Sequence, residues 1–167
     1  MTLGVGDLKP AASELVRLLA ERRLSVATAE ATTGGQVGHH IVAVPGSSAV
    51  FRCGVAPYSN AAKVRIGVPD GVLQEHGAVG REAAEALAVA VKAWSGADVG
   101  IAETGIAGPT GGGVIRPVGM FWVAVSTEKG TTSSQFVFGS DRAGNHRAAA
   151  EAALNLTIEV VRELPGV

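Results

Sequence analysis

The chain is short of several residue types, and each shortage excludes a class of protein. Cys53 is the single cysteine among 167 residues, which excludes an internal disulfide and a zinc site built from several cysteines. The 14 basic and 15 acidic residues nearly cancel and form no block of like charge, so we expect no binding to nucleic acid. No apolar run approaches the roughly 18 residues of a membrane span, and Asp7 and Lys9 interrupt the region where a signal peptide is apolar. We therefore expect a cytoplasmic protein that does not contact membranes.

Aromatic side chains are also scarce, at 4% of residues, whereas hydrophobic residues make up 47% and charged residues 17%. This balance excludes a disordered chain, and the length predicts one domain over residues 1–167. The core must come mainly from Ala, Val, Leu and Ile. The 23 glycines exceed average usage, and we expect them where backbone approaches backbone or a ligand.

Hydrophobic periodicity predicts helices that alternate with strands. Helices are expected over residues 11–23, 81–94 and 143–164, with a shorter one between the turn at 30–35 and Val44 and helical turns at 61–65 and 71–76. Strands are expected over 24–29, 51–58, 99–102, 118–126 and 135–138. The alternation indicates an α/β fold with a largely parallel sheet. The turn at Glu128-Lys129-Gly130 predicts at least one antiparallel pair.

Two glycine-rich segments follow predicted strands, where ligands of open α/β sheets bind. Glu30–Gly35 is a strand-to-helix turn whose N–H groups offer a place for a phosphate, or it is an ordinary turn capped by Thr33. Thr104–Gly113 is either held against a substrate or another subunit, or is a flexible loop. Ile106 and Pro109 favour the packed conformation.

A third segment, Tyr58–Lys63, carries a lysine in an otherwise apolar neighbourhood. A desolvated Lys63 would have a lowered pKa and could act as a base for a hydroxyl nucleophile. The alternative is a solvated lysine on a surface turn. The four histidines show no metal-ligand spacing, so we expect no metal site.

Six motifs occur in a recognisable order: AEATTGG (29–35), VPGSSAVF (44–51), YSNAAK (58–63), HGAV (76–79), TGIAGPTGGG (104–113) and PVG (117–119). Together they strongly resemble the CinA C-terminal domain family, whose active members are nicotinamide-nucleotide amidohydrolases. The resemblance spans about Val26 to Leu156. The N-terminal domain that some members carry is missing, so we expect the stand-alone form.

The resemblance implies a three-layer α/β/α sandwich with a mixed, mostly parallel sheet. It implies hydrolysis of nicotinamide mononucleotide to the nicotinate nucleotide and ammonia, by serine–lysine chemistry without a metal or cofactor. By position, Lys63 becomes the candidate base, with Ser48 and Tyr58 as candidate catalytic partners. The candidate substrate-binding residues are Thr32, Thr33, Gly34, Gly35, Asn60, Thr104, Gly105, Gly108, Arg142 and Arg147.

The sequence departs from the family pattern at the leading candidate nucleophile. The family usually reads Ala-Glu-Ser-Cys-Thr-Gly-Gly, and the serine is replaced by Ala31, which cannot attack a carbonyl. The acidic residue often found after Tyr-Ser-Asn is Ala61, and the loop that often reads Glu-Glu-Lys is Val114-Ile115-Arg116.

Three hypotheses follow. In the first, the chain is an amidohydrolase in which Ser48 attacks, Lys63 takes its proton, Tyr58 orients the pair, and the N–H groups of Thr33–Gly35 bind phosphate or oxyanion. In the second, it is a catalytically impaired nucleotide-binding protein that kept the pocket. In the third, it is a structural subunit whose glycine-rich loop packs on a partner. We expect a homo-oligomer and a small-molecule nucleotide ligand, with Lys63 buried and within hydrogen-bonding reach of a hydroxyl from Ser48 or Tyr58.

Overall fold

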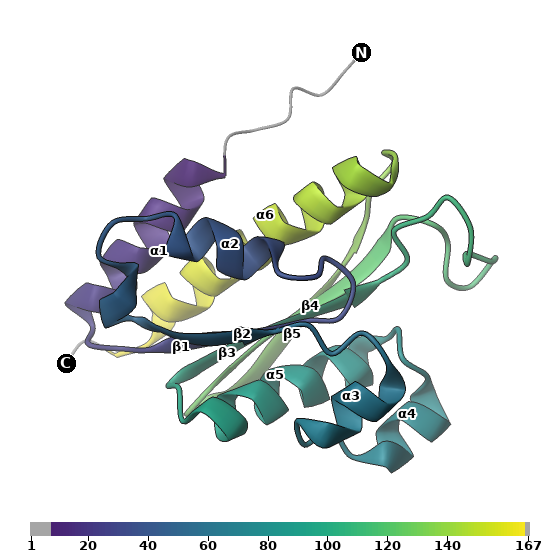
Figure 1. The fold of residues 1–167 in the computed structure, drawn as a ribbon, viewed down its shortest axis with the longest axis horizontal. Coiled ribbons are helices and arrows are strands. Elements are labelled where there is room, and N and C mark those ends of the chain that lie inside the picture. Colours follow the sequence, from purple (N-terminus) through teal and green to yellow (C-terminus); the bar gives the residue numbers. More distant parts are fainter. Residues whose placement is uncertain (1–7, 166–167) are drawn as a thin grey trace.

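The computed structural model describes residues 8–165, which form a five-stranded sheet between two layers of helices (Figure 1). The strands are β1 (Val26–Glu30), β2 (Phe51–Val55), β3 (Val99–Gly105), β4 (Met120–Thr127) and β5 (Gly130–Val137), in the spatial order β2-β1-β3-β4-β5. β1 is parallel to β2 and β3, whereas β4 is antiparallel to β3 and β5. The expected three-layer α/β/α fold with a mixed sheet is confirmed, and its parallel part is the half formed by β2, β1 and β3.

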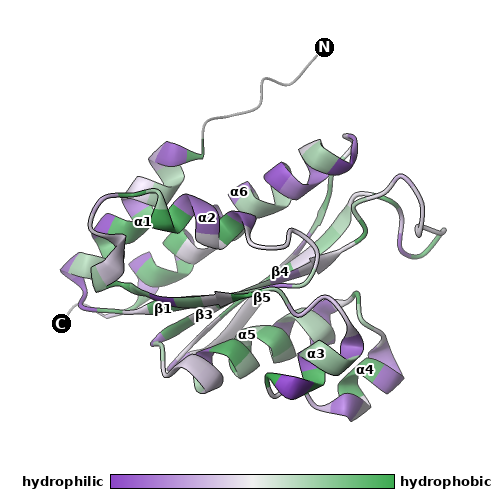
Figure 2. Ribbon diagram, viewed as in Figure 1, coloured by the Kyte–Doolittle hydropathy of each residue, from purple (hydrophilic) through white to green (hydrophobic). Residues whose placement is uncertain are grey.

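Helices cover both faces of the sheet. One face carries α1 (Lys9–Glu21), α2 (Gln36–Val42) and α6 (Arg142–Glu163), and the other carries α5 (Arg81–Ser95), with α3 (Asn60–Arg65) and α4 (Asp70–His76) beside it (Figure 1). The alternation of side chains along β1 divides the core between the two layers. Val26 packs with α1, α2 and α6, whereas Ala27 and Ala29 pack with α5. Along α1, α2 and α5, hydrophobic residues alternate with hydrophilic ones (Figure 2), as expected for helices with one buried face.

The α5 face is built from small side chains because the helix lies close to the strands. Its buried residues are largely alanines, among them Ala83, Ala84 and Ala88. At Gly100, an added Cβ would meet the Ala88 carbonyl oxygen at 2.2 Å. The glycine therefore permits a close approach that no other residue allows.

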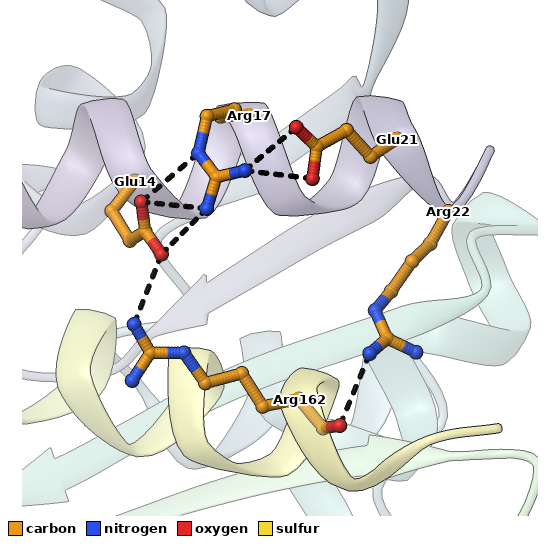
Figure 3. Close-up of polar contacts among 5 residues, drawn as sticks. All are labelled: Glu14, Arg17, Glu21, Arg22 and Arg162. Atoms are coloured by element: carbon orange, nitrogen blue, oxygen red, sulfur yellow. Dashed lines mark hydrogen bonds and ion pairs between the residues drawn. The ribbon is translucent and has the colours of Figure 1, made fainter. Parts of the chain in front are cut away.

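Polar contacts join α1 to α6 at the surface (Figure 3). Arg17 pairs with Glu14 and Glu21 on its own helix, and Arg162 of α6 reaches Glu14 Oε1 at 3.0 Å. Arg22 donates to the carbonyl oxygens of Arg162 at 3.1 Å and of Leu164 at 2.6 Å. Exposed ion pairs of this kind add little to stability, but the bonds from Arg22 satisfy carbonyls that the end of α6 leaves unpaired.

The element bounds differ most from expectation in three strands. β2 ends at Val55 rather than at Tyr58. β3 continues through Gly105 rather than ending at Ala102, and β5 begins at Gly130 rather than Gln135. β5 pairs with β4 along its whole length, so Thr127 lies opposite Gly130 and the turn is two residues long. The polar first half of β5 hides this pairing from hydrophobic patterning. Between residues 8 and 165, no helix has the length and apolar character needed to cross a membrane.

Candidate functional site

A cavity of about 260 Å³ opens where β1 and β3 end. In the order of the sheet, the chain continues from β1 to β2 on one side and from β3 to β4 on the other, and ligand sites of α/β proteins form where the connections diverge in this way. The lining residues are Ala31, Thr32, Tyr58, Lys63, Ala78, Val79, Thr104, Gly105, Ile106, Ala107, Gly108, Thr110, Gly111 and Arg142. A larger hollow of about 540 Å³ lies between β5 and α6, but none of the predicted site residues lines it.

The structure brings seven predicted site residues to this cavity: Thr32, Tyr58, Lys63, Thr104, Gly105, Gly108 and Arg142. Six others do not line it: Thr33, Gly34, Gly35, Ser48, Asn60 and Arg147. Asn60 and Arg147 are exposed elsewhere on the surface, so of the two candidate arginines only Arg142 lies at the cavity.

Lys63 is buried, as expected, with 3% of its surface exposed. It follows the N-cap of α3, where the Ser59 side chain accepts a hydrogen bond from the backbone N–H of Ala62. Its Nζ donates to the backbone carbonyl of Tyr58 at 3.1 Å, so its partner is not the hydroxyl that the motif predicts. Burial lowers the pKa of Lys63, and the charge of Glu103 opposes that shift.

Arg142 and Tyr58 form the outer rim of the cavity. Arg142, the first residue of α6, donates from Nη1 to the Gly108 carbonyl at 2.9 Å and from Nη2 to the Tyr58 hydroxyl at 3.4 Å. The Tyr58 side chain is well exposed, at 63%. A guanidinium held in this way leaves donors for an anionic group at the rim.

Ser48 lies at the other end of the sheet. It belongs to a short 3-10 helix, Ser47–Ala49, directly before β2, whereas Tyr58 and Lys63 follow β2. The five residues of β2 span roughly 16 Å, and Ser48 is exposed. The expected contact between Ser48 and Lys63 is therefore wrong within one chain, because the strand that separates them in sequence also separates them in space.

The turn after β1 points its N–H groups into the protein and not into the cavity. The backbone N–H groups of Thr32 and Thr33 donate to Glu103 Oε1 at 2.8 and 2.7 Å. The N–H of Gly35 donates to Glu30 Oε2 at 3.0 Å. The expected phosphate or oxyanion position at Thr33–Gly35 is therefore wrong, since two carboxyl groups of the same chain already fill it.

Two of the hydroxyl groups that line the cavity, those of Thr32 and Thr104, are engaged with the backbone. Thr32 Oγ1 accepts from the Gly105 N–H at 2.8 Å and donates to the Gly105 carbonyl at 3.2 Å. Thr104 Oγ1 donates to the Ala78 carbonyl at 2.7 Å. Ala31, at the position where the sequence resemblance predicts a serine, also lines the cavity.

Sequence reasoning missed the two acidic residues behind the cavity. Glu30 and Glu103 are 1% and 0% exposed and lie opposite each other in the parallel register of β1 and β3. Burial, with the charge of Glu30 adding to it, raises the pKa of Glu103 to about 7 even though N–H groups donate to it. The available signal was an acidic residue at the end of each apolar strand. Among residues 8–165, no group of three His, Cys, Asp or Glu residues could hold a metal ion.

Comparisons with known proteins agree with this architecture. The CinA C-terminal domain family matches residues 8–161. A CinA-like protein of Chloroherpeton thalassium is 42% identical over 157 residues, 91% of this chain and 37% of the relative. One from Anaeromyxobacter dehalogenans is 46% identical over 143 residues, 85% of this chain and 35% of the relative. The chain thus spans about a third of the length of these relatives.

Solved structures extend the similarity to the whole fold. The competence/damage inducible protein CihA of Agrobacterium tumefaciens superposes with a TM-score of 0.90 at 32% identity, covering 98% of this chain and all of that one. The competence damage-inducible protein A of Klebsiella pneumoniae superposes with a TM-score of 0.91 at 28% identity, covering 96% and 100%. The chain belongs to the CinA C-terminal domain family.

Proposed function

We propose that the chain binds a nicotinamide nucleotide in the cavity at the ends of β1 and β3, and that it hydrolyses the carboxamide poorly. One observation carries this proposal: Ala31 and the buried Lys63 line the same cavity. The site thus keeps a desolvated amine but presents a methyl group where the family has its candidate nucleophile. Binding and covalent catalysis are separable in such a site, because contacts to the rest of the nucleotide do not require the nucleophile.

The residues have distinct roles in this proposal. Arg142 binds the phosphate at the rim, where a guanidinium makes charge-assisted hydrogen bonds. The backbone of Gly105–Gly108 lies along the nucleotide, and Lys63 faces the carboxamide inside the cavity. The ribose and phosphate extend past Tyr58, which is exposed at the rim, and lie outside the volume of about 260 Å³.

The hydroxyl groups of Thr32, Thr104 and Ser48 are poorly placed to replace the serine. The Thr32 and Thr104 hydroxyls hold backbone groups, and Ser48 lies at the opposite end of β2. A hydroxyl attacks a carbonyl efficiently only when a base can take its proton. The catalytically impaired form of the site is therefore favoured over attack by Ser48.

A second candidate function is slow amide hydrolysis by water. The lowered pKa of Lys63 increases the fraction of neutral amine, which can accept a proton from a water molecule as that water attacks the carboxamide carbon. The proton then passes to the departing nitrogen, and ammonia leaves. This route predicts low but measurable turnover that disappears in Lys63→Met.

Ammonia release from nicotinamide mononucleotide tests the proposal. Ala31→Ser should raise turnover by at least ~10², the scale on which one catalytic group acts. The control Ala43→Ser, at the exposed end of α2, should leave turnover unchanged. Thermal-shift titration should give the same nucleotide affinity for all three proteins. A fast wild type that Ala31→Ser does not improve, or a wild type that the nucleotide does not stabilise, contradicts the proposal.

A matched arginine pair tests the phosphate contact. Arg142→Gln should weaken binding of the nucleotide about tenfold, because hydrogen bonds to a charged group are worth about 1.5–3 kcal/mol. Arg147→Gln should have no effect, because that side chain does not line the cavity. Equal effects of the two substitutions would remove Arg142 from the proposed site.

A further inference from the structure

Glu30 and Glu103 form a buried acidic pair behind the cavity wall. They lie opposite each other on adjacent parallel strands, and both are almost completely buried. Two ionised carboxylates at facing positions of adjacent strands, without a cation between them, would repel each other strongly in a medium of low dielectric constant. The geometry around Thr33 indicates how the pair avoids this.

One hydroxyl lies between the two carboxyl groups. Thr33 Oγ1 is 2.6 Å from Glu30 Oε2 and 2.9 Å from Glu103 Oε1. A hydroxyl has a single hydrogen to donate, and an ionised carboxylate can only accept. The two short contacts can be separate, well-directed hydrogen bonds only if one of the carboxyl groups carries a proton.

Glu30 has the donors of an ionised carboxylate. Its Oε2 accepts from the N–H groups of Gly35 and Val37 at 3.0 and 2.9 Å, and its Oε1 accepts from the N–H of Gly38 at 2.8 Å. The contact of 2.6 Å with Thr33 has the length of a hydroxyl donating to a charged oxygen. Three N–H groups and one hydroxyl thus stabilise a negative charge on Glu30. The proton therefore belongs on Glu103.

Glu103 has the surroundings of a neutral carboxyl group. Its Oε1 accepts from the N–H groups of Thr32 and Thr33. Its Oε2 is buried and finds no hydrogen-bond partner within residues 8–165. An ionised oxygen left without a donor in the interior is costly. A proton on Oε1, donated to Thr33 Oγ1, makes Oε2 a neutral carbonyl oxygen and so reduces that cost.

We propose that Glu30 and Glu103 hold one proton between them, on Glu103, and that the neutral Glu103 is a positioning residue for the turn that carries Ala31 and Thr32 to the cavity. The Glu103 side chain fixes the N–H groups of Thr32 and Thr33, and its backbone carbonyl accepts from the Ala31 N–H at 3.1 Å. The raised pKa of Glu103, about 7, agrees with this geometry. The inference holds whichever ligand occupies the cavity.

Few charged groups act on the pair. β1 contributes Glu30, and α3 contributes Lys63, whose pKa is lowered by burial against the opposing effect of a charge on Glu103. α2 carries His39, which is exposed, and His40, which is half-buried. α6 brings His146, whose pKa is lowered by burial and by Arg142, and β4 places the uncharged Val123 opposite Glu103. Loss of the Glu103 proton therefore adds a second negative charge beside Glu30 and favours the ammonium form of Lys63.

Carboxyl carbon-13 NMR over a range of pH tests the shared proton directly. In the wild type, one glutamate should titrate near pH 7 while ordinary glutamates titrate near about 4.3. That late transition should be missing in Glu103→Gln and retained in Glu151→Gln, a control at an exposed position on α6. If every glutamate of the wild type titrates in the ordinary acidic range, the inference is wrong.

The backbone amide signals of Thr32 and Thr33 test the positioning role. In the wild type, their chemical shifts should change with pH around the titration midpoint of Glu103. In Glu103→Gln, the same chemical shifts should be independent of pH over that range. A purely structural contact would leave them independent of pH in both proteins, which would overturn the positioning role. Glu30→Gln should lower the midpoint of Glu103, because it removes the neighbouring charge. The wild-type titration decides the matter even if this last variant does not fold.

Discussion

An acidic residue lies near each end of β3, and the surroundings shift the pKa values of these two residues in opposite directions. Asp98 directly precedes the strand and is exposed. Its Oδ2 accepts from both the N–H and the hydroxyl of Ser25 at 2.7 Å, and its own N–H donates to Ser25 Oγ at 3.2 Å. Burial works against the charge of Asp98, but the Ser25 hydrogen bonds and the charge of Arg52 outweigh it and lower the pKa. The ends of two neighbouring strands are thus joined by groups that satisfy each other.

At the other end of the same strand, Glu103 faces Glu30 across the Thr33 hydroxyl. One of its buried oxygens has no hydrogen-bond partner in the part of the chain that the structure describes. Burial raises its pKa. The two ends of the sheet therefore differ: the groups at the Asp98 end satisfy each other, whereas the end beside the cavity keeps a strongly perturbed carboxyl group. Strongly perturbed ionisable groups gather at functional sites because those sites accept an energetic cost that the rest of the fold avoids.

The largest effect is expected from a substitution that breaks the well-packed half of β3. In Gly100→Ala, the new methyl group would meet the Ala88 carbonyl at 2.2 Å and Lys92 Cβ at 2.8 Å. Overpacking against a helix backbone should lower the free energy of unfolding by about 3 kcal/mol or more. Urea denaturation measures this, with Gly139→Ala as the control, because nothing lies within 4 Å of its added Cβ. A loss below about 1 kcal/mol would show that α5 can move away from the sheet.

A smaller, pH-dependent effect is expected at the cavity end. Because folding raises the pKa of Glu103 to about 7, its contribution to stability is complete below the unfolded value of about 4.3 and is lost as pH rises through 7. Glu103→Gln cannot lose a proton, so its stability relative to the wild type should increase between pH 5 and pH 8. The gain is at most about 3 kcal/mol, since one pKa unit is worth about 1.4 kcal/mol.

Denaturation of Glu103→Gln and Glu151→Gln at several pH values checks this expectation. Glu151 is exposed, so its substitution should leave the wild-type pH dependence intact. If the free energy of unfolding depends on pH in the same way in all three proteins, Glu103 has the same pKa in the folded and the unfolded chain. The proposed difference between the two ends of β3 would then be wrong.

The smallest effect, with the opposite dependence on pH, is expected at Asp98. Its lowered pKa means that the carboxylate stabilises the fold above the unfolded value of about 3.9 and that this stability is lost as pH falls through the folded value. Asp98→Asn should therefore cost below about 1 kcal/mol near neutral pH, because the exposed group is screened by solvent. The cost should shrink in acid. A loss of stability in Asp98→Asn that grows as pH falls would contradict a lowered pKa for Asp98.

Much of the fold could be predicted from periodicity alone. The helix expected over 81–94 is observed as Arg81–Ser95, because a half-buried helix repeats its apolar residues at regular spacing. The apolar run Val99–Ala102 predicts a strand that ends before Glu103. That reading fails where a hydroxyl and backbone N–H groups bind the carboxyl group inside the protein.

The site could be predicted only in part. Tyr58 and Lys63 follow one strand and Thr104 ends another, so the rule that ligands bind at carboxyl ends of strands places them together. Ser48 belongs to a motif close to theirs in sequence, but it precedes the strand that Tyr58 follows. The N–H groups of Thr33–Gly35 are satisfied partly by Glu103, which is 70 residues from Thr33. Pairing at that distance is set by the register of β1 and β3, which local patterns do not report.

The order of the strands has a consequence for how the chain reaches its native state. β4 and β5 are joined by a turn of two residues, and such hairpins close in about 1–10 µs. The pairing of β1 with β3 brings together residues 73 positions apart, such as Ser25 and Asp98, at a much larger cost in chain entropy. The cavity also draws its lining from Ala31 to Arg142. A nascent chain therefore gains the complete cavity only after the start of α6 has been synthesised. During refolding, the ability to bind a ligand should appear at the rate of the slowest folding step.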